Sequence, residues 1–215
     1  MKKIYLSVLV LLISVASFAQ YKDPKAKVIL DQVSSKFKSY QSATAGFVYQ
    51  ILNAQGKVLS NKKGSVSMKG DKYNISFGAN KIISDGNTVW NYDPEAKEVT
   101  VNDANKSEGT ITPQKLFTDF YNKDFNYVLG KEMTVAGKKS NQIIMTPTDK
   151  RKPFERVYLA VDKATKNILS ILVVEKSGNR YSYNLNNFKA NASVSDALFT
   201  FNQASYPGVE VVDLR

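Results

Sequence analysis

Two pairs of carboxylates lie close enough in the sequence to suggest acid–base chemistry, Asp93 with Glu95 and Asp119 with Asp124. Two carboxyl groups that flank a glycosidic bond are the usual machinery of glycoside hydrolases. The chain has no histidine and no cysteine, which excludes Ser–His–Asp and Cys–His catalysis and zinc sites with those ligands. No pattern places either pair across a cleft, and turn or surface positions account for all four acids. A hydrolase therefore stays an alternative only, and we expect neither catalysis nor a cofactor or metal.

Aromatic and aliphatic side chains alternate along several extended segments, and this pattern favours apolar binding. In residues 72–77, Tyr73, Ile75 and Phe77 share one face because the side chains of a strand point alternately to its two sides. Hiding an apolar ligand from water is worth about 0.8 kcal/mol per methylene. The alternative for each of these residues is ordinary core packing. We predict a hydrophobic cavity lined by Phe47, Tyr49, Tyr73, Ile75, Phe77, Trp90 and Tyr92, with Leu116, Phe117 and Phe120 supplied by a lid.

Two segments carry the signals of helices. Residues 24–40 follow Asp23, a good N-cap, and begin with Pro24 at the first helical position. Their apolar stripe, which includes Val33 and Phe37, predicts a helix that lies on a sheet. A second, shorter helix is predicted to start at Thr112 and Pro113, and its crowded aromatic stripe suits either a lid or a core-packing crossover.

The rest of the chain reads as strands and turns, centred on a meander in residues 81–101. There the run DGN at residues 85–87 predicts a tight hairpin turn, and the β-branched and aromatic residues 88–92 predict a strand. We count ten or eleven strands in a single antiparallel run. Such a sheet must curl into a barrel or split into a sandwich. The fold class is therefore mainly β, with a few short helices.

The first 19 residues predict a secretory signal peptide. Two lysines at positions 2 and 3 precede an almost wholly apolar run at residues 4–14, and cleavage is predicted after Ala19. A membrane anchor is the alternative, but the run is short for a span. Because Gln20 rather than a cysteine follows, the mature single domain of residues 20–215 is expected to be unlipidated.

The chain is basic, with a formal net charge of +11. Such an exported protein can bind nucleic acid, anionic polysaccharide, a lipid surface or an acidic partner. The lysines are spread along the whole chain and no nucleic-acid motif is present. We therefore interpret the lysines as a solvated surface and expect no nucleic-acid partner.

Taken together, the order and spacing of several motifs resemble the LolA-type periplasmic carriers of outer-membrane lipoproteins. The resemblance covers nearly the whole mature chain. Its motifs are AGFVYQ at residues 45–50, SDGNTVWNYDP at 84–94, Thr-Pro at 146–147, FTF at 199–201 and PGVEVVD at 207–213.

The resemblance implies an unclosed antiparallel β-barrel of about eleven strands, with short α-helices that form a lid. It also implies a periplasmic monomer that binds the acyl chains of lipoproteins between sheet and lid. The implied partners are acylated lipoproteins, an inner-membrane lipoprotein-releasing ABC transporter and an outer-membrane receptor. The alternative is a lipid- or lipoprotein-binding envelope sensor on the same scaffold.

One position departs from the family pattern. Members carry a basic residue, an arginine in well-known cases, followed by proline, and that residue latches the lid. Here Lys69 is the nearest equivalent and the proline is missing. Lysine lacks the planar fork of arginine, so a latch at Lys69 is expected to be weaker and less directional. A solvated turn lysine is the alternative.

Overall fold

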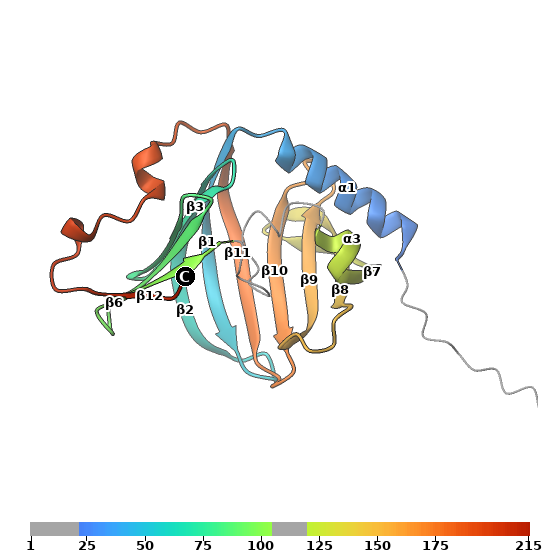
Figure 1. Cartoon of the computed structure of the whole chain (residues 1–215). Coiled ribbons are helices and arrows are strands. Elements are labelled where there is room, and N and C mark those ends of the chain that lie inside the picture. The colour runs from blue at the N-terminus through green and yellow to red at the C-terminus, as the bar shows by residue number, and fades with distance from the viewer. Residues whose placement is uncertain (1–21, 105–119) are drawn as a thin grey trace, which may run out of the picture.

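A computed structural model describes residues 22–104 and 120–215, and most of them belong to one large sheet (Figure 1). Within those residues, twelve strands follow the order β12-β6-β5-β4-β3-β2-β1-β11-β10-β9-β8-β7. The strands are β1 Ser42–Leu52, β2 Val58–Lys69, β3 Lys72–Phe77, β4 Asn80–Ser84, β5 Thr88–Asp93, β6 Glu98–Asp103, β7 Phe125–Val135, β8 Lys138–Pro147, β9 Phe154–Asp162, β10 Ile168–Glu175, β11 Arg180–Ala190 and β12 Glu210–Asp213.

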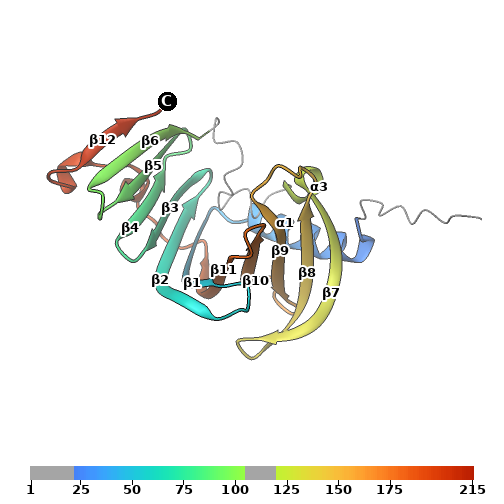
Figure 2. The same cartoon turned by 90° about the horizontal axis from the view of Figure 1, so that it is seen from below.

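The sheet topology confirms the predicted mainly β, unclosed fold. Strands β1 to β6 form one meander, β7 to β11 form a second, and β1 joins the two by pairing with β11 along its length. Strands β7 and β12 are the two outer strands of the order, so the sheet curves without closing on itself (Figure 2). The expectation of a single antiparallel run is wrong at one end, because β12 pairs with β6 in parallel.

The predicted first helix is α1, Pro24–Lys38, two residues shorter than expected because the chain leaves the helix at Ser39. The carboxylate of Asp23 caps it by accepting a hydrogen bond from the backbone N–H of Lys25 at 2.8 Å. The same carboxylate accepts the N–H of Leu129 at 3.0 Å, and this bond chiefly lowers the pKa of Asp23. The cap therefore also fixes the start of α1 to the outer strand β7.

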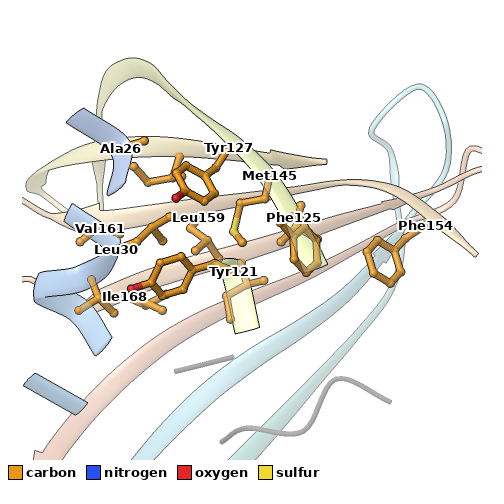
Figure 3. Packing of buried hydrophobic residues seen from close by; sticks show 14 residues of the cluster. Ala26, Leu30, Tyr121, Phe125, Tyr127, Met145, Phe154, Leu159, Val161 and Ile168 are labelled. Atoms are coloured by element: carbon orange, nitrogen blue, oxygen red, sulfur yellow. The ribbon is translucent and has the colours of Figure 1, made fainter. Parts of the chain in front are cut away.

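The larger hydrophobic cluster lies where α1 crosses β7 to β10 (Figure 3). Ala26, Leu30 and Val33 form the buried stripe of the helix, as their three- and four-residue spacing predicts. The short helix α3, Phe120–Asp124, adds the buried ring of Tyr121. The sheet side of this cluster is made of buried side chains of its strands, among them Tyr127, Ile143, Met145, Val157, Leu159, Val161, Ile168 and Ile171.

A second cluster lies on the other meander. Its buried members are Ala43, Met68, Tyr73 and Val89, and the end of α1 reaches it through Phe37. The helix therefore bridges the two clusters along one face of the sheet.

A C-terminal segment covers part of the opposite face. It holds two 3₁₀ turns, η1 Asp196–Phe199 and η2 Gln203–Ser205, before it returns as β12. Figure 1 shows this segment on the side of the sheet away from α1. Turn η1 contacts β3 and β4, and Phe199 within it is completely buried. The segment is thus an integral layer of the fold.

Several predicted features lie outside the described residues. These are the signal peptide of residues 1–19 with its cleavage site, and the start of the second helix with Leu116 and Phe117. Phe120 begins α3, but the description does not extend to its side chain. None of the described helices is long and apolar enough to cross a membrane.

Candidate functional site

Strand register sorts the side chains of the sheet onto two faces. Directly paired residues of antiparallel strands point to the same side. We call the side on which α1 lies the helix-side face; its clusters include Leu159 and Ile171 of one meander and Ile75 and Val89 of the other. The helix-side face is therefore continuous across both meanders.

Five predicted cavity residues lie on the helix-side face: Phe47 and Tyr49 of β1, and Tyr73, Ile75 and Phe77 of β3. The two sets are connected through β2, since Phe47 pairs with Gly64 and Gly64 pairs with Phe77. A side chain at Gly64 would overlap the ring of Phe47. The glycine thus lets that ring lie across the neighbouring strand.

Strand β11 supplies residues that the sequence-based prediction missed. Tyr183 lies opposite Tyr49, and Leu185 lies opposite Phe47. The rings of Tyr49 and Tyr183 are 5.1 Å apart between centroids, and Tyr181 stacks on Tyr49 at 6.3 Å. The alternation of Tyr181, Tyr183 and Leu185 was visible in the sequence. Their proximity to β1 depends on a pairing between segments more than 100 residues apart.

Two predicted cavity residues, Trp90 and Tyr92, do not lie on this face. Ile75 pairs with Ile82, and Ile82 pairs with Asn91, so Asn91 takes the helix-side position. Alternation then places Trp90 and Tyr92 on the opposite face. This corrects the assignment of all these residues to one cavity.

The exposure of the helix-side face changes along the sheet. Phe47 and Tyr73 are buried, at 6% and 4% exposure. In contrast, Tyr49, Ile75, Phe77, Tyr181 and Tyr183 remain half-buried among the described residues. The half-buried group forms an apolar, mostly aromatic surface that the described parts of the chain cover only in part.

The hydroxyl groups on this surface stay neutral at physiological pH. Burial raises the pKa of Tyr49 to about 12, with smaller contributions from Tyr183, Tyr181 and Glu175. Burial also raises the pKa of Tyr73 and of Tyr183. The surface thus offers aromatic rings and uncharged hydroxyls, which suits an apolar ligand with polar groups at one end.

A small pocket lies beneath the C-terminal end of α1. It is bordered by Phe37 and Tyr40 on the helix side and by Leu185 and Phe188 of β11. Its volume is about 30 Å³, which is room for one or two water molecules and not for an acyl chain. None of its lining residues belongs to the half-buried aromatic group around Tyr49.

Lys69, the predicted lid latch, makes a different contact. Met68 belongs to the helix-side cluster, so its neighbour Lys69 points to the opposite face. There its Nζ lies 2.7 Å from Oδ2 of Asp196, and Lys72 Nζ lies 3.0 Å from Oδ1. Both lysines lower the pKa of Asp196, Lys69 more strongly. In this structure Lys69 anchors the C-terminal segment.

The carboxylate pairs of the alternative hydrolase are not brought together as a described site. Asp93 caps its own turn by accepting hydrogen bonds from the backbone N–H groups of Glu95 and Ala96. Asp119 lies outside the described residues. The aromatic helix-side surface is therefore the candidate site.

The family model and the relatives with similar sequences carry the same description. Residues 38–202 match the family model described as "Outer membrane lipoprotein carrier protein LolA". An outer-membrane lipoprotein carrier protein of Histophilus somni (strain 2336) is 28% identical over 194 residues, covering 86% of this chain and 88% of that protein. One from Haemophilus influenzae (strain PittEE) is 30% identical over 178 residues, covering 80% of each.

Solved structures share the fold at low sequence identity. An uncharacterised conserved protein from Thermus thermophilus superposes with a TM-score of 0.60 at 13% identity, covering 88% of this chain and 99% of that one. The lipoprotein LppX of Mycobacterium tuberculosis gives a TM-score of 0.51 at 10% identity, covering 81% and 99%. At these identities the likeness supports the fold alone.

Proposed function

Because the chain belongs to the LolA family of outer membrane lipoprotein carrier proteins, we propose that it carries lipoproteins by binding their acyl chains on the helix-side face. The observation that supports this most directly is the aromatic surface around Tyr49 and Tyr183. It is apolar, continuous across β1, β3 and β11, and only half-buried.

The physical reason for such a surface is reversible binding. Acyl chains leave water with a gain of about 0.8 kcal/mol per methylene, so even partial cover of a chain gives useful affinity. A fully enclosed site would hold the chains more tightly and release them slowly. A half-buried site, which the described parts of the chain cover only in part, lets the chains enter and leave.

We propose that the protein carries its cargo across the periplasm. Residues 1–19 direct export to the periplasm, and the mature chain, residues 20–215, acts there as a monomer. It receives acylated lipoproteins from an inner-membrane ABC transporter and delivers them to an outer-membrane receptor. Binding and release complete the cycle, with no bond made or broken. The names of the relatives support the cargo and the destination.

A release assay tests the proposal. The mature chain is incubated with ATP and inner-membrane vesicles that contain triacylated lipoprotein and a lipoprotein-releasing transporter. We expect a soluble one-to-one complex of carrier and lipoprotein. A matched pair of variants then locates the site: Tyr49→Ser is expected to reduce the complex, and Tyr92→Ser, on the opposite face, is not.

Failure of the assay has two distinguishable forms. If no complex forms but the chain still binds a fluorescent fatty acid in a Tyr49-dependent manner, the surface serves lipid binding or sensing instead of carriage. If neither ligand binds, the helix-side surface is not an acyl-binding site.

A further inference from the structure

The hairpin that joins β1 and β2 extends beyond its neighbours on one side. Strand β2 pairs with β1 from Val58 to Lys69, but with β3 only from Gly64 onward. The first six residues of β2 therefore have a strand partner on one side only among the described residues. Figure 1 shows this hairpin at the end of the sheet opposite α1, next to the turn between β10 and β11.

The hairpin tip presents two adjacent apolar side chains to solvent. Val58 is 43% exposed and Leu59 is 61% exposed. The register shifts between the pairs Ile51–Ser60 and Leu52–Val58, so Leu59 is the extra residue of a bulge and has no partner opposite it. Exposed single leucines are common, but here a bulge holds one beside an exposed valine at a protruding tip.

Basic side chains surround these two residues. Lys57 precedes them in the turn, and Lys62 and Lys63 follow on the same strand. None of the three forms an ion pair with a described residue. The turn between β10 and β11 lies close to the β1–β2 hairpin, because Gly178 is next to Ala54. Lys176 and Arg180, on either side of that turn, add two more basic residues.

We propose that this tip, residues 57–63, is the surface with which the protein contacts an anionic phospholipid bilayer. Leu59 and Val58 would enter the boundary between headgroups and acyl chains, while the lysines pair with lipid phosphates. Each lysine near such a surface strengthens binding roughly fivefold at physiological salt. An additional β-strand is a less suitable partner for this tip than a bilayer, because lysines along a free strand edge discourage strand addition.

The proposal does not depend on lipoprotein carriage, because it needs neither a cargo nor a transporter. The tip and the aromatic surface adjoin at one position, where Lys62 pairs with Tyr49. The charge variants below therefore leave Lys62 unchanged. A weak bilayer contact would bring a protein that exchanges ligands with membranes to the membrane surface. This contact should be measurable with pure lipid vesicles.

Co-sedimentation of the mature chain with vesicles tests the apolar part. Vesicles of phosphatidylcholine with about 30% phosphatidylglycerol are compared with vesicles of phosphatidylcholine alone. The double variant Val58→Ser/Leu59→Ser is expected to lose at least about fivefold in apparent affinity for the anionic vesicles. The control is Val211→Ser/Leu214→Ser, because these residues are 40% and 61% exposed but have the acids Glu210 and Asp213 as neighbours.

Charge reversal tests the basic part. Lys57→Glu/Lys63→Glu is expected to weaken binding at least about tenfold. Lys131→Glu/Lys139→Glu, on β7 and β8 near the β9–β10 turn, is expected to weaken it much less. Raising the salt concentration should weaken binding of the wild type and cause little further loss in the Lys57/Lys63 variant.

Several outcomes would overturn the proposal. These are no binding to anionic vesicles, equal binding to neutral ones, or equal losses in the test and control variants. Tyr49→Ser separates the bilayer contact from the carrier function, because that variant should bind vesicles like the wild type even where it fails to bind a fatty acid.

Discussion

The ring of Tyr92 on β5 lies 4.6 Å, centroid to centroid, from the ring of Tyr206 in the C-terminal segment. Tyr206 also stacks on Phe201 at 4.9 Å, and its hydroxyl accepts a hydrogen bond from Lys81 Nζ at 2.9 Å. The chain thus covers its own aromatic residues on this face. On the helix-side face, the described ring partners of Tyr49 all belong to the sheet, namely Phe77, Tyr181 and Tyr183.

Tyr49 and Tyr92 form a matched pair for fatty-acid binding. Both are half-buried tyrosines on strands of the same sheet, but they point to opposite faces. Tyr49→Ser removes an aromatic contact from the proposed site and should weaken binding of a fluorescent fatty acid by roughly fivefold or more. Tyr92→Ser should leave the affinity nearly unchanged. A larger loss in the Tyr92 variant would place the ligand on the wrong face for our proposal.

Phe199 should be the most sensitive residue of the C-terminal segment. It is completely buried, whereas its neighbour Leu198 is 47% exposed. Phe199→Ala should lower the free energy of unfolding by about 3–5 kcal/mol, because it leaves a cavity under η1. Leu198→Ala should change it by less than about 0.5 kcal/mol. Urea unfolding followed by tryptophan fluorescence measures both, and equal values would show that the segment is only loosely packed.

The pairing of Asp196 with Lys69 and Lys72 should give a small, pH-dependent stabilisation. Hydrogen bonds from the two lysines lower the pKa of Asp196 below its usual 3.8. A carboxylate with a lowered folded-state pKa stabilises the fold above its unfolded value, and the effect fades as the pH falls below about 3.8. The wild type should therefore exceed Asp196→Asn in stability at about pH 6, and the difference should shrink at about pH 3.

Thermal unfolding at the two pH values measures this difference. The effect should also weaken in high salt, because both lysines and the carboxylate are exposed. A difference that is equally large at the acidic and the near-neutral pH would mean that Asp196 acts through something other than its charge.

Tyr49 should ionise at an unusually high pH. Its pKa of about 12 means that it stays protonated while solvent-exposed tyrosines ionise near pH 10. Since the folded-state pKa is raised, the associated stability is complete below about pH 10 and is lost as the pH rises toward about 12. Ultraviolet titration of tyrosinate should show a late step, and Tyr49→Phe should reduce its amplitude by one tyrosine. If the variant and the wild type titrate identically, the ring is not buried as the structure shows.

Local sequence signals predicted the elements well. Asp23 and Pro24 marked the start of α1, and the alternation of Tyr73, Ile75 and Phe77 marked β3. These features depend on neighbours within a few residues. The parallel pairing of β12 with β6 could not be predicted in this way, because it joins residues more than 100 positions apart and leaves no mark in either strand.

The site was predictable only in part for a related reason. Alternation shows that Trp90 and Tyr92 share a face, but it does not show which face of the sheet that is. Only the chain of pairings from Ile75 through Ile82 to Asn91 decides it. Likewise, the partner of the lysine at position 69 is an aspartate from a segment 127 residues away, which no local pattern could indicate.

Site-specific photo-crosslinking tests the central claim most directly. A benzophenone amino acid replaces Tyr49 in one variant and Tyr92 in another, and each is loaded with lipoprotein by the transporter and ATP before irradiation. We expect the Tyr49 variant to crosslink to the acylated lipoprotein and the Tyr92 variant to give no such product. A crosslink from Tyr92 with none from Tyr49, in a complex that forms normally, would contradict acyl-chain binding on the helix-side face.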